Sequence, residues 1–208
     1  MSQFSISGRV ICGQRAAIPS EPFMRQGDLS HTRHPRVIDT LRQSRNHPPQ
    51  QRKEGDLIVG LGSVSAMVTL RERKTQYGII VNLPLDHTAV SVNAAIIDVF
   101  ATLPPHLKRT LTWDQGVELA WHEKLTQTTG VPVFFAERSS PWQRGANENF
   151  NGLARQYFPK GTNLALHSAK HVANVVKELN DRPRKTLDYD TPAERLSAEY
   201  DTPAINLR

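Results

Sequence analysis

Residues 54–83, EGDLIVGLGSVSAMVTLRERKTQYGIIVNL, decide the fold of this chain. They contain three strand-like runs, at Asp56–Val59, Val64–Leu70 and Tyr77–Leu83, separated only by short turns. This spacing predicts an antiparallel meander. Because glycine supplies the backbone freedom that turns need, Gly60-Leu61-Gly62 is interpreted as a hairpin turn. A dinucleotide-binding motif would need a third glycine where Ser65 stands.

Strands and helices alternate after the meander. Asp86 is expected to cap a helix over Thr88–Thr102, whose apolar residues recur at three- and four-residue steps. The further predicted elements are a strand at Leu111–Trp113, a helix near Val117–Thr128, a strand at Val131–Phe135, and helices at Asn147–Tyr157 and Ser168–Asn180. A meander followed by alternating helices and parallel strands predicts the α/β class, with a mixed sheet of about five strands flanked by helices.

Residues 1–53 differ in composition and patterning from the rest of the chain. Positions 1–55 hold nine Lys or Arg against four Asp or Glu, so most of the net charge of +6 lies there. With five prolines and no sustained periodicity, this segment is expected to be a flexible basic leader. The predicted organisation is the leader 1–53, a core 54–198 and a tail 199–208. The basic excess suggests a polyanionic partner but does not identify one.

The sequence gives no sign of secretion or membrane insertion. Its longest uncharged stretch, Leu57–Leu70, is 14 residues long and cannot span a bilayer. A single cysteine, Cys12, excludes an internal disulfide framework and a cysteine-based zinc site. A cytoplasmic location is therefore expected.

Three acidic residues stand where a sheet of this type places its ligands. Asp56 begins an apolar strand, Asp114 ends a short one, and Glu148 lies in the first turn of a predicted helix. Converging carboxylates repel one another, and a hard divalent cation removes that repulsion while taking oxygen ligands by preference. Two such ions can activate a water or hydroxyl and stabilise the leaving oxygen of a phosphodiester.

The order and spacing of these residues resemble the Asp-Asp-Glu transposases and retroviral-type integrases, with 33 residues between Asp114 and Glu148. Several motifs are similar to those of the insertion sequence 30 transposase family over about residues 54–196: EGDLIVG at 54–60, ERKT at 72–75, LTWD at 111–114, SPWQRG at 140–145, NEN at 147–149, RQYFPKG at 155–161 and NDRPRK at 180–185.

The resemblance implies a ribonuclease H-like fold and a reaction that depends on Mg²⁺ or Mn²⁺, with two ions per site. It implies DNA cleavage at transposon ends, strand transfer into target DNA, and a homo-oligomer on that DNA. Asp56, Asp114 and Glu148 would hold the metals. Arg155, two helical turns after Glu148, would grip a neighbouring phosphate. The further predicted DNA-binding residues are Trp142, Arg144, Asn147, Asn151, Lys160, Arg182, Arg184 and Lys185.

Some of these residues have a second interpretation. The asparagines around Glu148 are also expected as helix caps, and Trp142 as a packing aromatic. Full-length family members carry helix-turn-helix regions ahead of the core, and no such pattern precedes residue 54 here. The sequence therefore suggests a truncated copy. The alternative function is a catalytically idle remnant that binds DNA, and a structure-directed nuclease on the same fold stays open.

Overall fold

The computed structural model describes residues 52–114, 119–136 and 145–201. Its strands are β1 (Arg52–Val59), β2 (Ala66–Glu72), β3 (Gly78–Leu83), β4 (Thr110–Trp113) and β5 (Val133–Phe135). Its α-helices are α2 (Ala89–Thr102), α3 (His122–Thr129), α4 (Gly145–Ala154), α5 (Ala169–Asn180) and α6 (Pro192–Asp201). Short 3-10 turns are η1 (Leu61–Ser63), η2 (Pro105–Leu107), η5 (Leu164–Leu166) and η6 (Lys185–Leu187).

The five strands form one mixed sheet in the order β3-β2-β1-β4-β5. Strands β1, β2 and β3 pair antiparallel, while β4 pairs parallel with both β1 and β5. This arrangement confirms the predicted meander and the predicted change to parallel strands. The hairpin turn between β1 and β2 is also confirmed, because Gly62 adopts a left-handed φ of 64° there and Gly60 N donates to Ser65 O.

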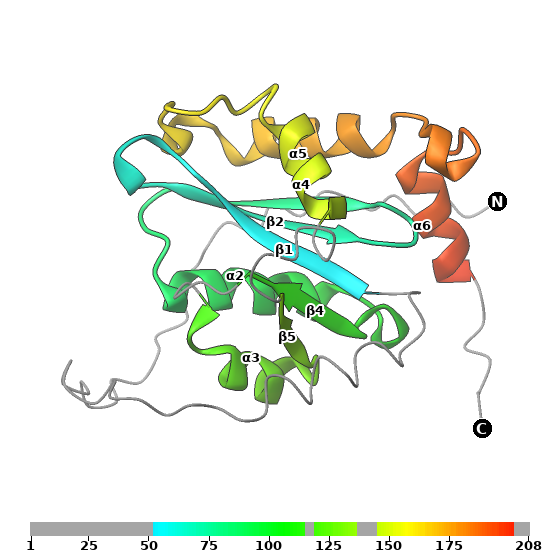
Figure 1. The fold of residues 1–208 in the computed structure, drawn as a ribbon, viewed down its shortest axis with the longest axis horizontal. Helices are drawn as coiled ribbons and strands as arrows, with labels where there is room; N and C mark the ends of the chain where they lie inside the picture. Colours follow the sequence, from blue (N-terminus) through cyan, green and yellow to red (C-terminus); the bar gives the residue numbers. More distant parts are fainter. Residues whose placement is uncertain (1–51, 115–118, 137–144, 202–208) are drawn as a thin grey trace.

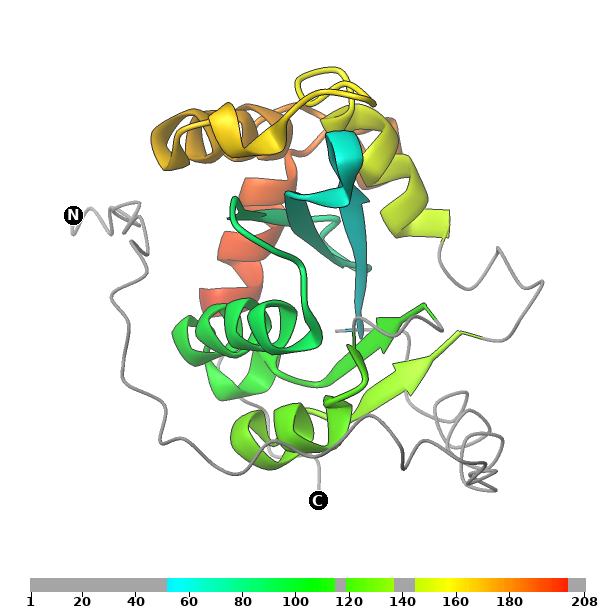
Figure 2. The same ribbon diagram turned by 90° about the vertical axis from the view of Figure 1, so that its left-hand side faces the viewer.

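Helices cover both faces of the sheet. In Figures 1 and 2, α4 and α5 lie on one side of the sheet and α2 and α3 on the other. Each face has its own apolar cluster. Phe100, Leu111 and Trp113 belong to the cluster under α2, whereas Phe150 and Leu179 belong to the one under α4 and α5. Side chains alternate between the faces of a strand, so successive residues of β1 face different helices.

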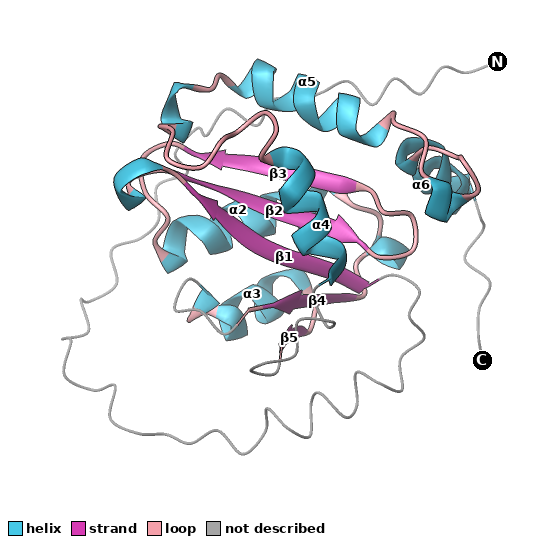
Figure 3. Ribbon diagram, turned by 45° about the horizontal axis from the view of Figure 1, so that its top comes forward, coloured by secondary structure: helices cyan, strands magenta, loops and turns pink. Residues whose placement is uncertain are grey.

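Helix α4 crosses the sheet over β1 and β2 (Figure 3). Its anchor is Phe150, which is 1% exposed and packs directly over Gly78 of β3. Any Cβ at position 78 would lie 2.1 Å from the Phe150 ring, so the close approach requires glycine. Asn180 completes the contact, since its amide accepts from Gly78 N and donates to Gly78 O, both at 2.8 Å. The edge of β3 is thereby closed by a side chain that imitates a neighbouring strand.

The structure corrects several predicted element boundaries. Strand β1 begins at Arg52, four residues before the predicted start, and α3 begins at His122 rather than near Val117. The N-cap of α2 is Thr88, which accepts from Ser91 N, so the prediction that Asp86 caps this helix was wrong. Asp86 instead accepts hydrogen bonds from the amide and hydroxyl of Thr88.

Helix α6 was not predicted at all, although its start carries a clear signal. Thr191 and Glu194 form a reciprocal capping box, in which Glu194 N donates to Thr191 Oγ1 at 3.1 Å and Thr191 N donates to Glu194 Oε2 at 2.8 Å. Pro192 occupies the first helical position, where a missing amide hydrogen costs nothing. Among the helices of the described ranges, none combines the length and apolar character that crossing a membrane requires.

Candidate functional site

One predicted carboxylate, Asp56, lies within β1, and a second, Asp114, directly follows the neighbouring strand β4. Strand β1 pairs with β4 in a parallel register in which Glu54 is opposite Thr112. Continuing that register by two residues places Asp56 opposite Asp114, just beyond the last paired residues. The carboxyl ends of parallel strands are where open α/β sheets bind ligands. The strand pairing therefore predicts that Asp56 and Asp114 are neighbours across β1 and β4.

Asp56 is half-buried and is held from two sides. Its Oδ2 accepts from Asn151 Nδ2 of α4 at 3.0 Å, and its Oδ1 accepts from Leu57 N at 2.8 Å. Hydrogen bonds to a carboxylate favour its charged form and fix its rotamer. Asn151, expected at the sequence level to contact DNA or cap a helix, is thus a partner of the first carboxylate.

Glu148 lies in the first turn of α4 and is exposed. The three carboxylates offer oxygen donors, which suit Mg²⁺ or Mn²⁺. Within residues 52–114, 119–136 and 145–201, however, no three His, Cys, Asp or Glu side chains form a group that could hold one metal ion. The carboxylate oxygens suit a hard cation, but the three side chains would have to move closer together to bind one ion.

Three residues spaced by four, two in α4 and one just past its end, contact β1. Asn147 N donates to Glu54 Oε2 at 3.0 Å, Asn151 binds Asp56, and Arg155 Nη2, just past the end of α4, donates to Val59 O at 3.3 Å. Residues spaced by four lie on one face of a helix, so these three form a polar stripe along the strand. Burial lowers the pKa of Arg155, and the charge of Asp56 opposes that shift.

Two charged side chains are buried where α4 begins. Glu54 is 1% exposed, and Arg71 of β2 is 3% exposed. Burial raises the pKa of Glu54, against the opposing effects of Asn147 N–H, Arg73 and Arg71. Burial also disfavours the charged form of Arg71, and it lowers the pKa of this arginine to about 10. Sequence reasoning assigned neither residue to the site. The available signal was strand alternation, which puts Glu54 on the same face as Asp56.

The other predicted DNA-binding residues have varied environments. Asn147 is 2% exposed and its Nδ2 donates to Thr69 Oγ1 at 3.3 Å, so its side chain faces the protein interior. Arg182 contacts Glu178 and Tyr157, and Arg184 Nη2 donates to Leu179 O at 3.0 Å. Lys160 and Lys185 are exposed. Trp142 and Arg144 lie outside the described residues.

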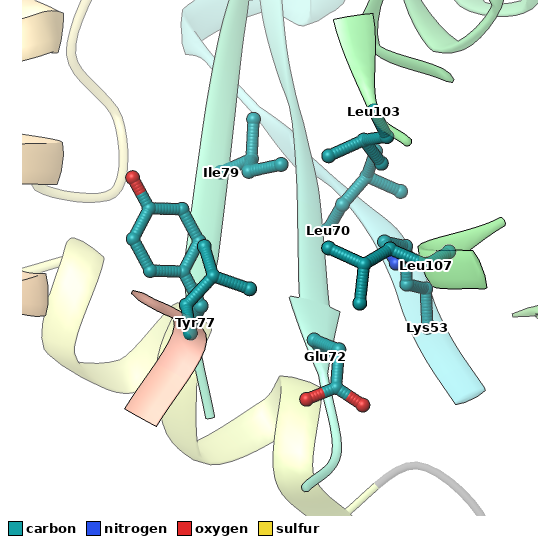
Figure 4. Close-up of a pocket in the computed structure, with 8 residues that line it drawn as sticks. Lys53, Leu70, Glu72, Tyr77, Ile79, Leu103 and Leu107 are labelled. Carbon is teal, nitrogen blue, oxygen red and sulfur yellow. Dashed lines mark hydrogen bonds between the residues drawn. The ribbon is translucent and has the colours of Figure 1, made fainter. Parts of the chain in front are cut away.

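A small pocket lies on the opposite face of the sheet. It is lined by Lys53, Leu70, Glu72, Tyr77, Ile79, Leu103, Leu107 and Leu196 (Figure 4). Lys53 Nζ donates to Leu107 O at 2.5 Å, and burial lowers the pKa of this lysine to about 8. Because Lys53 and Leu70 belong to the α2 face while Asp56 binds α4, the pocket is separate from the carboxylate site.

Comparisons with solved structures define the class of fold. The catalytic core domain of BIV integrase aligns with a TM-score of 0.54 and 18% identity, covering 73% of this chain and 97% of that domain. A chain of the simian T-cell lymphotropic virus intasome in complex with PP2A regulatory subunit B56 gamma aligns with a TM-score of 0.56 and 13% identity, covering 76% of this chain and 56% of that one. The chain thus has the ribonuclease H-like fold of integrase catalytic cores, as predicted.

Sequence comparison identifies the family within that class. The chain is 52% identical over 141 residues to transposase InsI for insertion sequence element IS30A of Escherichia coli (strain K12), covering 68% of this chain and 36% of that protein. It is 42% identical over 177 residues to the transposase for insertion sequence element IS1086 of Cupriavidus metallidurans, covering 85% of this chain and 50% of that protein. The chain belongs to the insertion sequence 30 transposase family.

These matches also set the extent of the relationship. No family model matches the chain. The chain spans only about a third to a half of the length of these two relatives. The match to the Cupriavidus transposase, at 177 residues, is longer than the stretch from residue 54 to residue 208. It therefore includes part of residues 1–53, which the motifs in the sequence leave unmatched.

Proposed function

We propose that this chain carries the core of a transposase that cuts DNA phosphodiesters at transposon ends and joins the freed ends to target DNA, using divalent metal ions. The observation that carries the proposal is the parallel pairing of β1 with β4, whose register, continued two residues beyond Glu54 and Thr112, would bring Asp56 opposite Asp114. The 52% identity to an insertion sequence transposase supports the same reaction.

Asp56, Asp114 and Glu148 are the proposed metal ligands. These residues would hold a pair of Mg²⁺ or Mn²⁺ ions, which would supply activation of the attacking water or 3′ hydroxyl and stabilisation of the leaving oxygen. The protein's own part is to hold its ligands in place. Asn151 orients the Asp56 carboxylate through its 3.0 Å hydrogen bond, and the β1–β4 pairing is proposed to keep Asp56 close to Asp114.

Three basic side chains, Arg155, Lys160 and Lys185, are proposed to bind the DNA backbone. Arg155, at the far end of the polar stripe, is proposed to contact a phosphate beside the one that reacts. Lys160 and Lys185 are exposed and have the charge for further phosphate contacts. Strand transfer at two DNA ends suggests a homo-oligomer on the DNA.

The test is a nicking and joining assay with supplied transposon-end DNA in Mg²⁺ or Mn²⁺. Glu148→Gln removes one proposed ligand charge while keeping the side-chain shape, and should abolish both products. Glu123→Gln, an exposed glutamate on α3, is the matched control and should keep parental activity. A parent chain that binds this DNA in a salt-sensitive way but forms neither product would instead support an idle DNA-binding remnant.

A further inference from the structure

Two side chains of opposite charge form hydrogen bonds with the backbone in the first turn of α4. Arg71 Nη1 donates to Ala146 O at 2.6 Å, and Glu54 Oε2 accepts from Asn147 N at 3.0 Å. The two side chains come from adjacent antiparallel strands, where Glu54 and Arg71 are directly opposite each other. The carbonyl and the amide of the single peptide unit between Ala146 and Asn147 are therefore both fixed to the sheet, immediately before Glu148.

We propose that Glu54 and Arg71 are positioning residues, which fix the first turn of α4 on the sheet so that Glu148 faces Asp56 and Asp114. This inference rests on the proposed function, because it assigns a purpose to the placement of Glu148. The amide of Asn147 is one of the helix-start N–H groups that has no partner within the helix. A buried carboxylate at that point also interacts favourably with the helix dipole.

A second set of contacts ties the same turn to Asp56. Thr69 Oγ1 donates to the backbone oxygen of Asp56 at 3.2 Å and accepts from Asn147 Nδ2 at 3.3 Å. The backbone of the first proposed metal ligand is thus linked through one hydroxyl to the residue that precedes the third. Asn151 adds the direct bond from α4 to Asp56 Oδ2. A shift of α4 along β1 would break the Asn147–Thr69 and Asn151–Asp56 hydrogen bonds together.

The presence of two buried charged residues indicates that these contacts fix the position of α4 along β1 and do not serve packing alone. Burying a glutamate and an arginine is expensive, and apolar residues of similar size would pack α4 at least as well. Arg73 Nε lies 3.0 Å from Glu54 Oε1, an ion-pair distance that further fixes the carboxylate. Apolar contacts allow a helix to slide, whereas directed hydrogen bonds to consecutive backbone groups hold it at one position.

The experiment compares Glu54→Gln and Arg71→Lys with Glu72→Gln. Glu72 is a matched control, since it is also buried in this strand pair but its carboxylate binds Lys74 N and Thr75 N in the β2–β3 turn, away from α4. The readouts are Mn²⁺ affinity by electron paramagnetic resonance, amide hydrogen exchange over residues 145–154, urea unfolding, and kcat and KM for nicking.

The positioning role predicts that Glu54→Gln and Arg71→Lys each weaken Mn²⁺ binding about tenfold or more, the usual effect of losing a residue that orients a metal ligand. Exchange in the first turn of α4 should quicken, and kcat should fall while KM for DNA stays the same. Glu72→Gln should match the parent in all three.

Parental Mn²⁺ affinity or parental exchange in Glu54→Gln would overturn the role. Unfolding of Glu54→Gln but not of Glu72→Gln would also overturn it, by making Glu54 a residue of general stability. If the parent itself neither binds Mn²⁺ nor nicks DNA, the proposed function fails, and exchange over 145–154 alone then decides whether Glu54 fixes the helix.

Discussion

Replacing Gly78 with alanine tests how α4 is anchored to the sheet. In an unconstrained strand, this change would stabilise the protein by roughly 0.5–1 kcal/mol, because alanine loses less backbone freedom on folding. Here the added Cβ would lie 2.1 Å and 2.2 Å from two carbons of the Phe150 ring. Carbon atoms pack best at about 3.5–4.0 Å, so the ring has to move by more than an ångström.

Phe150 has little room to do so, because it is 1% exposed. Overpacking of this kind costs about 1–3 kcal/mol, which outweighs the gain in chain entropy. We therefore expect Gly78→Ala to lower the free energy of unfolding in urea by about 1–3 kcal/mol. Gly152→Ala is the control on the same helix, since a Cβ there meets nothing within 4 Å. It should stabilise the protein by up to about 1 kcal/mol.

A double-mutant cycle identifies the cause. Phe150→Leu shortens the side chain that opposes position 78, so part of the cost of Gly78→Ala should disappear in that background. The expected coupling is at least about 0.5 kcal/mol, as for other residues in contact. A Gly78→Ala variant as stable as the parent, or strictly additive effects in the cycle, would refute the claim that Phe150 needs a glycine beneath it.

Two further predictions concern buried polar groups. Asn180→Ala leaves Gly78 N–H and C=O without their partner. The free energy of unfolding in urea should therefore fall by at least about 1–3 kcal/mol. A fall of less than about 0.5 kcal/mol would contradict the account. Burial lowers the pKa of Lys53 to about 8, from 10.5 in the unfolded chain. Between these values only the unfolded chain keeps the proton, so stability should rise with pH by at most about 1.4 kcal/mol per unit. Lys53→Met should remove this rise between pH 8 and 9.5, and an unchanged slope would show that Lys53 is not its source.

The fold followed from local patterns, and the parts that did not follow depend on distant contacts. Apolar runs with short turns were enough to predict the meander, and the motif spacing is the basis on which Asp56 and Asp114 are proposed as metal ligands. The role of Glu54 could not be read in the same way, because its partner Asn147 is 93 residues away. Asn147 is buried at this same place, where its N–H reaches Glu54 and its side-chain amide reaches Thr69.

Helix α6 shows the opposite case, in which a local signal was present and not used. Thr191-Pro192-Ala193-Glu194 is a capping box with proline at the first helical position, and both hydrogen bonds of the box form. The helix itself has a weak apolar stripe, with Leu196 as a buried member. Periodicity alone therefore misses it.

The most direct test of the central claim is a Mn²⁺ titration followed by electron paramagnetic resonance on the parent, Asp56→Asn and Asp114→Asn. If the β1–β4 register brings these two carboxylates to one metal site, each substitution should weaken Mn²⁺ binding by about tenfold or more, the loss that even an outer partner of a ligand causes. The Asp98→Asn control, an exposed aspartate of α2, should bind as the parent does. Parental Mn²⁺ affinity in either Asp56→Asn or Asp114→Asn would contradict the account.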